Sequence, residues 1–195
     1  MHTYSMRDCP RERYILVVAL AAVAVAAIAK QAAGYFGVVV SITTFSAFGA
    51  LYFVFDRWLW QIPLIGRVIG IPNLAGKWTI RGRTDGADGV PRDWEGNVTI
   101  EQTWSQIAIS IETSHSRSRS AMAAIERDPG HGFRIIYGYE NRPKDVDSDL
   151  RSHRGTCDVV VAADLLSAEA AYFNDHQRRT FGTMKWLRDT SMKGT

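Results

Sequence analysis

The chain has 195 residues, of which 46% are hydrophobic, and a formal net charge of +3 at pH 7. This length allows roughly one domain beside a membrane anchor. From Gly76 to the end, 17 basic residues balance 17 acidic ones, so the positive excess lies entirely before Gly76. The balance argues against a polyanion-binding surface, and we expect neither DNA nor RNA as a partner.

Two uncharged stretches near the N-terminus predict a transmembrane hairpin. They cover 14–29 and 32–55, with Lys30 between them. A bilayer core takes about 20 apolar helical residues, so the second stretch is long enough and the first is short. Basic residues precede the first stretch and follow the second, which places both ends in the cytoplasm. The alternative for 1–29 is a secretory signal peptide.

Four segments follow from this pattern. We expect a cytoplasmic N-terminus over 1–13, a two-helix transmembrane hairpin over 14–57, a juxtamembrane linker over 58–73 and a cytosolic sensor domain over 74–195. Prolines and glycines interrupt the linker, so it cannot form a long helix. The two cysteines lie on different sides of the hairpin and suggest no disulfide framework.

After residue 74, apolar and polar residues alternate in eight short runs separated by turns. The runs begin around Trp78 and Ile80 and continue over 98–104, 107–111, 119–126, 132–140, 152–162, 166–174 and 179–188. This period predicts a compact eight-stranded antiparallel up-and-down β-barrel, with an open sandwich as the rival. A barrel of this size either encloses one small ligand or fills its interior with side chains.

No motif of an enzyme stands out. The five histidines are scattered, with no pair at metal-ligand spacing, and no nucleophile elbow is present. We therefore expect a protein without catalytic activity, metal site or cofactor.

Polar residues within the strand pattern are the candidates for ligand binding. Between 113 and 120, the serines share one face and His115, Arg117 and Arg119 share the other. This run is either a solvated edge or a set of hydroxyls or guanidiniums that contact an anionic ligand. Tyr137, Tyr139 and Asn141 also share a strand face. The two tyrosine rings either stack on the bases of a ligand or are ordinary core residues. Four further polar residues either complete a polar pocket or form hydrogen bonds in turns: His153, Asn174, Arg178 and Arg179.

The order of several short motifs resembles one bacterial family, the two-transmembrane, β-strand-rich effectors of CBASS antiphage systems. The resemblance rests on the apolar hairpin and on 76–78, 100–104, 116–120, 137–143, 153–155 and 172–174. It implies an inner-membrane protein whose cytosolic barrel binds a cyclic dinucleotide as activating ligand. A partner nucleotidyltransferase makes that ligand upon infection. Binding then promotes a homo-oligomer that disrupts the lipid bilayer, which is abortive infection.

The resemblance and the polar pattern together give the candidate ligand-binding residues: Trp104, Ser116, Arg117, Ser118, Arg119, Tyr137, Tyr139, Asn141, His153, Asn174 and Arg178. One departure is that alanines stand ahead of Tyr172, where the family pattern has a glycine. This departure weakens the assignment of Tyr172 and Asn174. The alternative function is a membrane-anchored, lipocalin-like barrel that binds a lipid or another apolar molecule.

Overall fold

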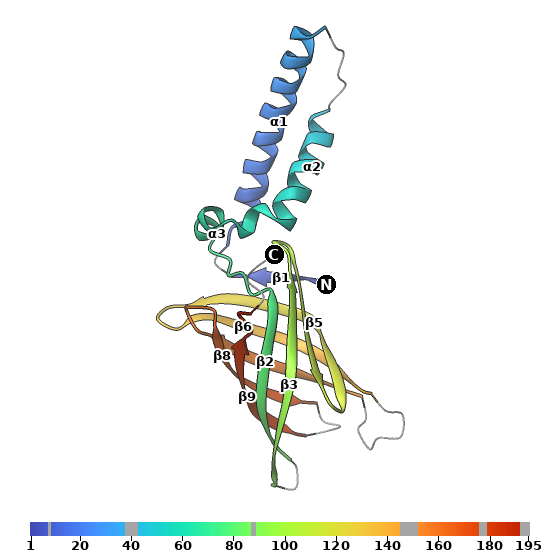
Figure 1. Cartoon of the computed structure of the whole chain (residues 1–195), viewed down its shortest axis with the longest axis vertical. Helices are drawn as coiled ribbons and strands as arrows, with labels where there is room; N and C mark the ends of the chain where they lie inside the picture. Colours follow the sequence, from blue (N-terminus) through green and yellow to red (C-terminus); the bar gives the residue numbers. More distant parts are fainter. Residues whose placement is uncertain (8, 38–42, 87–88, 145–151, 176–178, 192–195) are drawn as a thin grey trace. The chain divides into compact units, whose positions relative to one another are not determined.

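The computed structural model describes all residues except 8, 38–42, 87–88, 145–151, 176–178 and 192–195. The chain divides into two compact units (Figure 1). One unit is helical and covers Cys9–Ile71. The other combines Met1–Asp8 with Pro72–Thr195 and consists of β-strands.

The helical unit contains α1 (Arg11–Tyr35), α2 (Thr44–Arg57), the 3₁₀ helix η1 (Leu59–Gln61) and α3 (Pro63–Ile69). Within the described residues, α1 is the one helix that is long and apolar enough to cross a membrane. It continues past the predicted end at residue 29, because the lysine, glutamine and alanines that follow are strong helix formers. At 14 residues, α2 is about 21 Å long, so the expected relative lengths are reversed.

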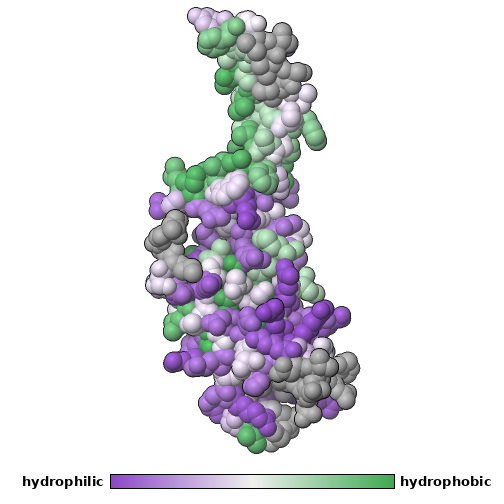
Figure 2. Space-filling view, turned by 45° about the vertical axis from the view of Figure 1, so that its right-hand side comes forward, coloured by the Kyte–Doolittle hydropathy of each residue, from purple (hydrophilic) through white to green (hydrophobic). Residues whose placement is uncertain are grey.

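Small residues bring α1 and α2 together. Ala22 and Ala26 on α1 are buried against Ala47 on α2, with Phe48 and Leu51 packed beside them. The large apolar side chains of α1 instead remain exposed, as the hydrophobic colouring of this unit shows (Figure 2). Two short helices follow α2, and the second of them is limited by Pro63, which begins α3, and by left-handed Gly70, which ends it.

The described residues of the β unit form nine strands. They are β1 (His2–Met6), β2 (Gly76–Asp85), β3 (Pro91–Gln102), β4 (Gln106–Thr113), β5 (Ser116–Asp128), β6 (Gly132–Pro143), β7 (His153–Val161), β8 (Ser167–Asn174) and β9 (Phe181–Arg188). Each of the eight predicted runs overlaps one of β2–β9, so the prediction of a mainly antiparallel β domain is confirmed. The serine-arginine run is part of a strand and not a loop, since β5 begins at Ser116.

Consecutive strands from β2 to β9 pair antiparallel, and β9 returns to pair with β2, so the strand order is that of a closed barrel. The closing register joins Trp78 to Arg188 at one end and Asp85 to Phe181 at the other. With β1 paired to both β4 and β5, the closed order of the described strands limits the exposed sheet edge.

Strand β1 was not predicted from the sequence. It lies in the region expected to be a cytoplasmic tail, and it pairs antiparallel with β4 and parallel with β5. Five residues with two large apolar side chains, Tyr4 and Met6, carry too little alternation to be recognised as a strand.

The barrel interior is packed along one half of its strands. Four buried tryptophan and isoleucine side chains, Trp78, Trp186, Ile80 and Ile109, are each about 1% exposed. Trp78 and Trp186 meet edge to face at 6.3 Å. This apolar filling supplies the stabilising core of the domain. The other half of the interior is hollow and is described next.

Candidate functional site

A cavity of about 450 Å³ occupies the hollow half of the barrel. Its walls come from the strand ends next to the β2–β3, β4–β5, β6–β7 and β8–β9 connections, so all eight strands of the closed order converge on it. The volume lies within the range of about 300–1,000 Å³ that is typical of small-molecule sites. The structure therefore combines the two possibilities that the sequence left open, a filled barrel and an enclosed cavity.

Three aromatic rings of the cavity wall lie against glycines on neighbouring strands. Trp94 on β3 is paired with Gly82, and Tyr139 on β6 is paired with Gly155. A methyl group at either glycine would overlap the facing ring. The third ring, from Tyr172 on β8, lies over Gly182 on β9 in the same way. The glycines thus provide the space in which flat rings lie along the wall.

Two short hydrogen-bond chains fix these rings. The indole Nε1–H of Trp94 donates to Thr84 Oγ1 at 2.9 Å, and the Thr84 hydroxyl is hydrogen-bonded to the Tyr172 hydroxyl. Trp94 and Tyr172 also meet edge to face at 6.2 Å. Because Thr84 joins both side chains, the two rings keep a fixed mutual orientation.

The second chain lies across β6, β8 and β9. The Tyr139 hydroxyl donates to Asn174 Oδ1 at 2.9 Å, and Asn174 Nδ2 donates to Thr180 Oγ1 at 2.6 Å. This pair of bonds assigns the amide orientation of Asn174. The alanines ahead of Tyr172 therefore do not keep Tyr172 or Asn174 out of the cavity, since both line it.

Tyr137 lies deepest among the cavity tyrosines and is 1% exposed. Its hydroxyl has no oxygen or nitrogen partner among the described residues, and its cross-strand neighbour is the thiol of Cys157. Burial raises the pKa of Tyr137 well above its usual value and raises that of Cys157 to about 12. Both groups are therefore neutral at physiological pH.

The serine-arginine run alternates between the two faces of β5. Ser116 and Ser118 line the cavity. Arg117 and Arg119 are exposed on the other face, where Arg117 Nη2 pairs with Glu112 Oε1 at 3.0 Å. The expectation that these two guanidiniums contact a ligand inside the barrel is therefore corrected. Since side chains alternate along a strand, the inward serines require outward arginines.

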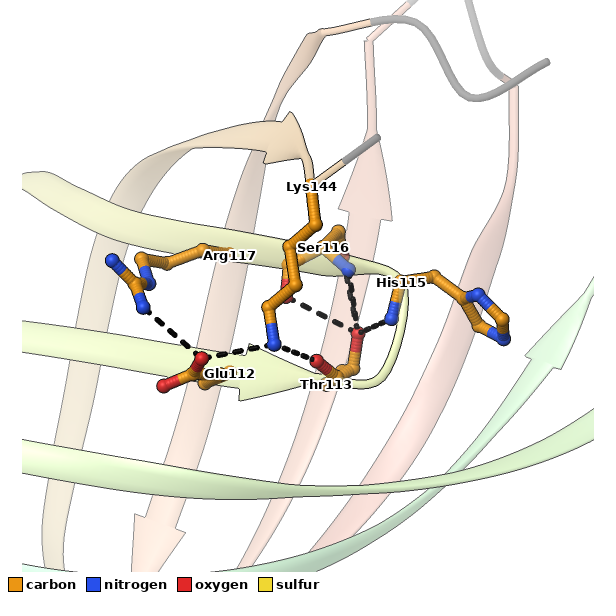
Figure 3. A network of polar contacts seen from close by, with 6 residues as sticks. All are labelled: Glu112, Thr113, His115, Ser116, Arg117 and Lys144. Carbon is orange, nitrogen blue, oxygen red and sulfur yellow. Dashed lines mark hydrogen bonds and ion pairs between the residues drawn. The ribbon is translucent and has the colours of Figure 1, made fainter. Parts of the chain in front are cut away.

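A polar network holds the β4–β5 turn at the cavity mouth (Figure 3). Thr113 Oγ1 accepts hydrogen bonds from the backbone N–H groups of His115 and Ser116, at 3.3 and 3.0 Å. Lys144 Nζ donates to the Thr113 carbonyl at 2.7 Å and pairs with Glu112 at 2.9 Å. Hydrogen bonds from Lys144 and Arg117 lower the pKa of Glu112.

Of the eleven sequence-predicted site residues, seven line the cavity: Ser116, Ser118, Tyr137, Tyr139, Asn141, His153 and Asn174. Asn141 and His153 are buried cross-strand partners on β6 and β7. Trp104 lies instead beyond the end of β3, is 1% exposed and is not part of the cavity wall. Arg178 lies outside the described residues.

The sequence reasoning missed Thr84 and Trp94. Steps of two residues back along β3 from the buried Val98 reach Gly96 and then Trp94. The same step along β2 from Ile80 reaches Thr84. Neither position lies in a predicted run, because Thr84 begins the Gly- and Asp-rich turn expected after the first strand and Trp94 precedes the run 98–104.

The interior of the cavity wall is rich in uncharged hydrogen-bonding groups, and the charged side chains of the described wall, Arg92, Asp93 and Glu95, are exposed. Arg92 is the one arginine or lysine of the described wall, and it is exposed at the mouth together with His115. The described residues contain no group of three or more histidine, cysteine, aspartate or glutamate side chains that could hold a metal ion. The wall is built to donate hydrogen bonds and to stack on flat rings.

This fold and cavity define a class, that of small antiparallel barrels with a polar, aromatic binding cavity at one end. Residues 69–188 match the family model described as Cap15, cyclic dinucleotide receptor domain. The chain is also 41% identical over 138 residues to the CD-NTase-associated protein 15 of Yersinia aleksiciae. This match covers 71% of the present chain and 65% of the length of the relative. The chain belongs to the Cap15 family of CBASS effectors.

Proposed function

We propose that this protein is a membrane-anchored receptor for a cyclic dinucleotide in CBASS antiphage defence. The observation that carries the proposal is the set of three aromatic rings laid against glycines in the cavity wall. Flat rings of this kind stack on nucleobases, at about 1–3 kcal/mol per base. The family match to a cyclic dinucleotide receptor domain supports the same ligand class.

Neutral donors bind the phosphates in this proposal. Hydroxyls of Ser116 and Ser118, the Asn141 amide and the His153 ring line the cavity, and the Tyr137 hydroxyl has no oxygen or nitrogen partner of its own. Such groups accept a phosphodiester without an internal counter-charge, and Arg92 attracts the anion against the opposing charges of Asp93 and Glu95. The protein acts as a receptor without catalysing a reaction.

The lining favours a nucleotide over an apolar ligand. A lipid carrier requires a wall of aliphatic side chains, whereas hydrogen-bonding groups left unpaired beside a lipid would cost about 1–3 kcal/mol each. In this cavity, Ile111 and Met184 are the aliphatic members of the described wall. The lipocalin-like alternative therefore has little support from the site.

The remaining steps concern the membrane. Exposed apolar side chains along α1 support insertion in the bacterial inner membrane, and we propose that the segment of α2 completes a second crossing. Dinucleotide from a partner nucleotidyltransferase favours a homo-oligomer of the receptor, and that assembly disrupts the bilayer, ending the infected cell. Ligand shifts this equilibrium only if it binds the assembled form more tightly.

The test is a titration of the full chain in detergent micelles with a panel of cyclic di- and trinucleotides, following the melting temperature. We expect a saturable rise with at least one cyclic dinucleotide, because a ligand that binds the folded state stabilises it. Trp94→Ala should weaken that affinity about tenfold or more, in line with the loss of one stacked base.

Arg119→Ala is the matched control, because Arg119 is exposed on the outer face of β5. It should leave the affinity unchanged. A flat response of well-folded wild-type protein to every nucleotide would refute the receptor proposal. An equal loss of nucleotide affinity in Arg119→Ala and Trp94→Ala would instead show that the ligand does not bind in the cavity.

A further inference from the structure

Strands β4 and β5 pair only near the cavity mouth and then separate. Their register covers Ser110–Glu112 with Arg117–Arg119 and ends there. At this point β5 also carries an irregularity in its pairing with β6, between Ser120 and Met122. The separation leaves a gap between β4 and β5 in the far half of the barrel, and β1 fills it.

The gap presents backbone groups to β1 on both sides. His2 and Thr3 pair antiparallel with Ile107 and Gln106 of β4. Tyr4, Ser5 and Met6 then pair parallel with 123–125 of β5. One short strand therefore changes partner in its middle, which is possible because the two walls of the gap diverge.

Ser120 lies at the end of the gap that is nearer to the cavity. Its Oγ accepts the backbone N–H of Ile109 at 2.9 Å and is 2.8 Å from His2 Nε2. His2 Nδ1 is 3.0 Å from the Thr3 carbonyl oxygen, which can only accept, so Nδ1–H is the donor of that bond. The Ser120 hydroxyl thus accepts a backbone N–H of β4 that β5 no longer pairs with, and it also binds the His2 side chain.

A second side chain of β1, that of Tyr4, is bound at the end of the gap farther from the cavity. Tyr4 is 3% exposed, and its hydroxyl donates to the Trp104 carbonyl at 3.0 Å. Gln102 Nε2 lies 3.4 Å from the same hydroxyl. On the outer face, Arg7 pairs with Glu126 of β5 at 3.2 Å. The gap therefore has specific positions for His2, Tyr4 and Arg7.

In the sequence, β1 is separated from all other strands by the helical unit Cys9–Ile71. Its hold on the barrel is consequently noncovalent at this end, and the same contacts would form with a β1 from another copy. Exchange of an identical element between copies is a low-cost route to an assembly, because it needs no new interface chemistry. Peptide strands are commonly bound by such addition to a sheet.

We propose that the gap between β4 and β5 is a strand-binding site, and that in the assembled protein it takes the β1 strand of a second copy. This exchange links copies through their barrels. The proposal goes beyond the receptor function and does not depend on the identity of the ligand. It concerns a five-residue strand whose His2 and Tyr4 are bound by Ser120 and by the Trp104 carbonyl.

The test is disulfide trapping between two differently tagged full-length chains that are co-expressed and extracted in detergent. One chain carries Thr3→Cys and the other Gln106→Cys, since these exposed residues are register partners. After oxidation with copper phenanthroline, we expect a crosslinked species that contains both tags. Its yield should exceed by about fivefold that of a matched pair in which Thr99→Cys on β3 replaces Gln106→Cys.

A chain that carries both cysteines reports the total occupancy of the gap, and chains with Thr3→Cys alone control for the native Cys9 and Cys157. Crosslinks confined to single chains, with the mixed pair at the Thr99→Cys level, would overturn the exchange. Absence of any Thr3–Gln106 crosslink would overturn the strand site itself. Adding Tyr4→Ala to the Thr3→Cys chain should lower the mixed yield several-fold.

Discussion

At the scale of single residues, the cavity depends on glycines as much as on the rings that face a ligand. Gly82 is required because the Trp94 ring lies where a Cβ would be. The glycine has no direct part in binding. Its role is to let the indole lie flat on the barrel wall, in reach of Thr84.

Gly82→Ala should therefore weaken dinucleotide binding about tenfold, or about 1.4 kcal/mol, by displacing the indole. Calorimetric titration of the full chain measures this affinity. The matched control is Gly138→Ala, where the added methyl meets the flexible Met122 side chain at 3.2 Å. Binding within twofold of wild type is expected for the control, and an unaffected Gly82→Ala protein would contradict the role of Trp94.

Gln102 is a second residue with several partners. Its Oε1 accepts the Leu74 N–H at 2.8 Å, and its Nε2 donates to the Pro72 carbonyl at 3.0 Å. Gln102→Leu leaves these buried groups unpaired and should lower the free energy of unfolding by roughly 2–4 kcal/mol. Urea unfolding measures the loss. Gln106→Leu, at an exposed position of β4, should cost less than about 0.5 kcal/mol.

At the scale of elements, the β4–β5 turn depends on the charge of Glu112. Lys144 and Arg117 hold the folded-state pKa of Glu112 below its ordinary value of 4.5. A depressed pKa means that this stabilisation is complete above the unfolded-state value and is lost as the pH falls through the folded-state value. The turn that borders the cavity should therefore loosen only in acid.

Comparison of the wild type with Glu112→Gln tests this sign. We expect the wild type to melt higher near pH 7, and the difference to shrink toward zero as the pH falls well below about 4. A difference that is constant across this range would show that the carboxylate charge does not stabilise the turn.

The elements were predictable to different degrees. Strands β2–β9 follow from alternation, because their inward side chains form a continuous apolar or polar face. Strand β1 could not be predicted from alternation, since its stability comes from side-chain partners, such as Ser120, that lie far away in sequence. The direction of the serine run was open for a similar reason. Alternation fixes which residues share a face, but only the neighbouring strands decide which face is inside.

At the scale of the whole molecule, the β unit is made of two separate parts of the chain. A fragment that starts at Pro72 contains eight of the nine strands and lacks β1. We predict that a peptide of residues 1–7 raises the melting temperature of this fragment in a saturable way. A peptide with His2→Ala and Tyr4→Ala should have little effect, and equal stabilisation by both would argue against specific positions in the gap.

The division of the barrel into a packed half and a hollow half also bears on how such receptors diversify. Each strand contributes to both halves, so the tryptophans and isoleucines at one end maintain the fold while the other end carries the ligand contacts. Substitutions of the polar wall residues at the hollow end, such as Ser116 and Thr84, remove little buried apolar area and leave most of the folding free energy intact. If the receptor proposal holds, a change of wall residue at the hollow end can alter the ligand preference while the tryptophans and isoleucines of the packed end keep the barrel folded.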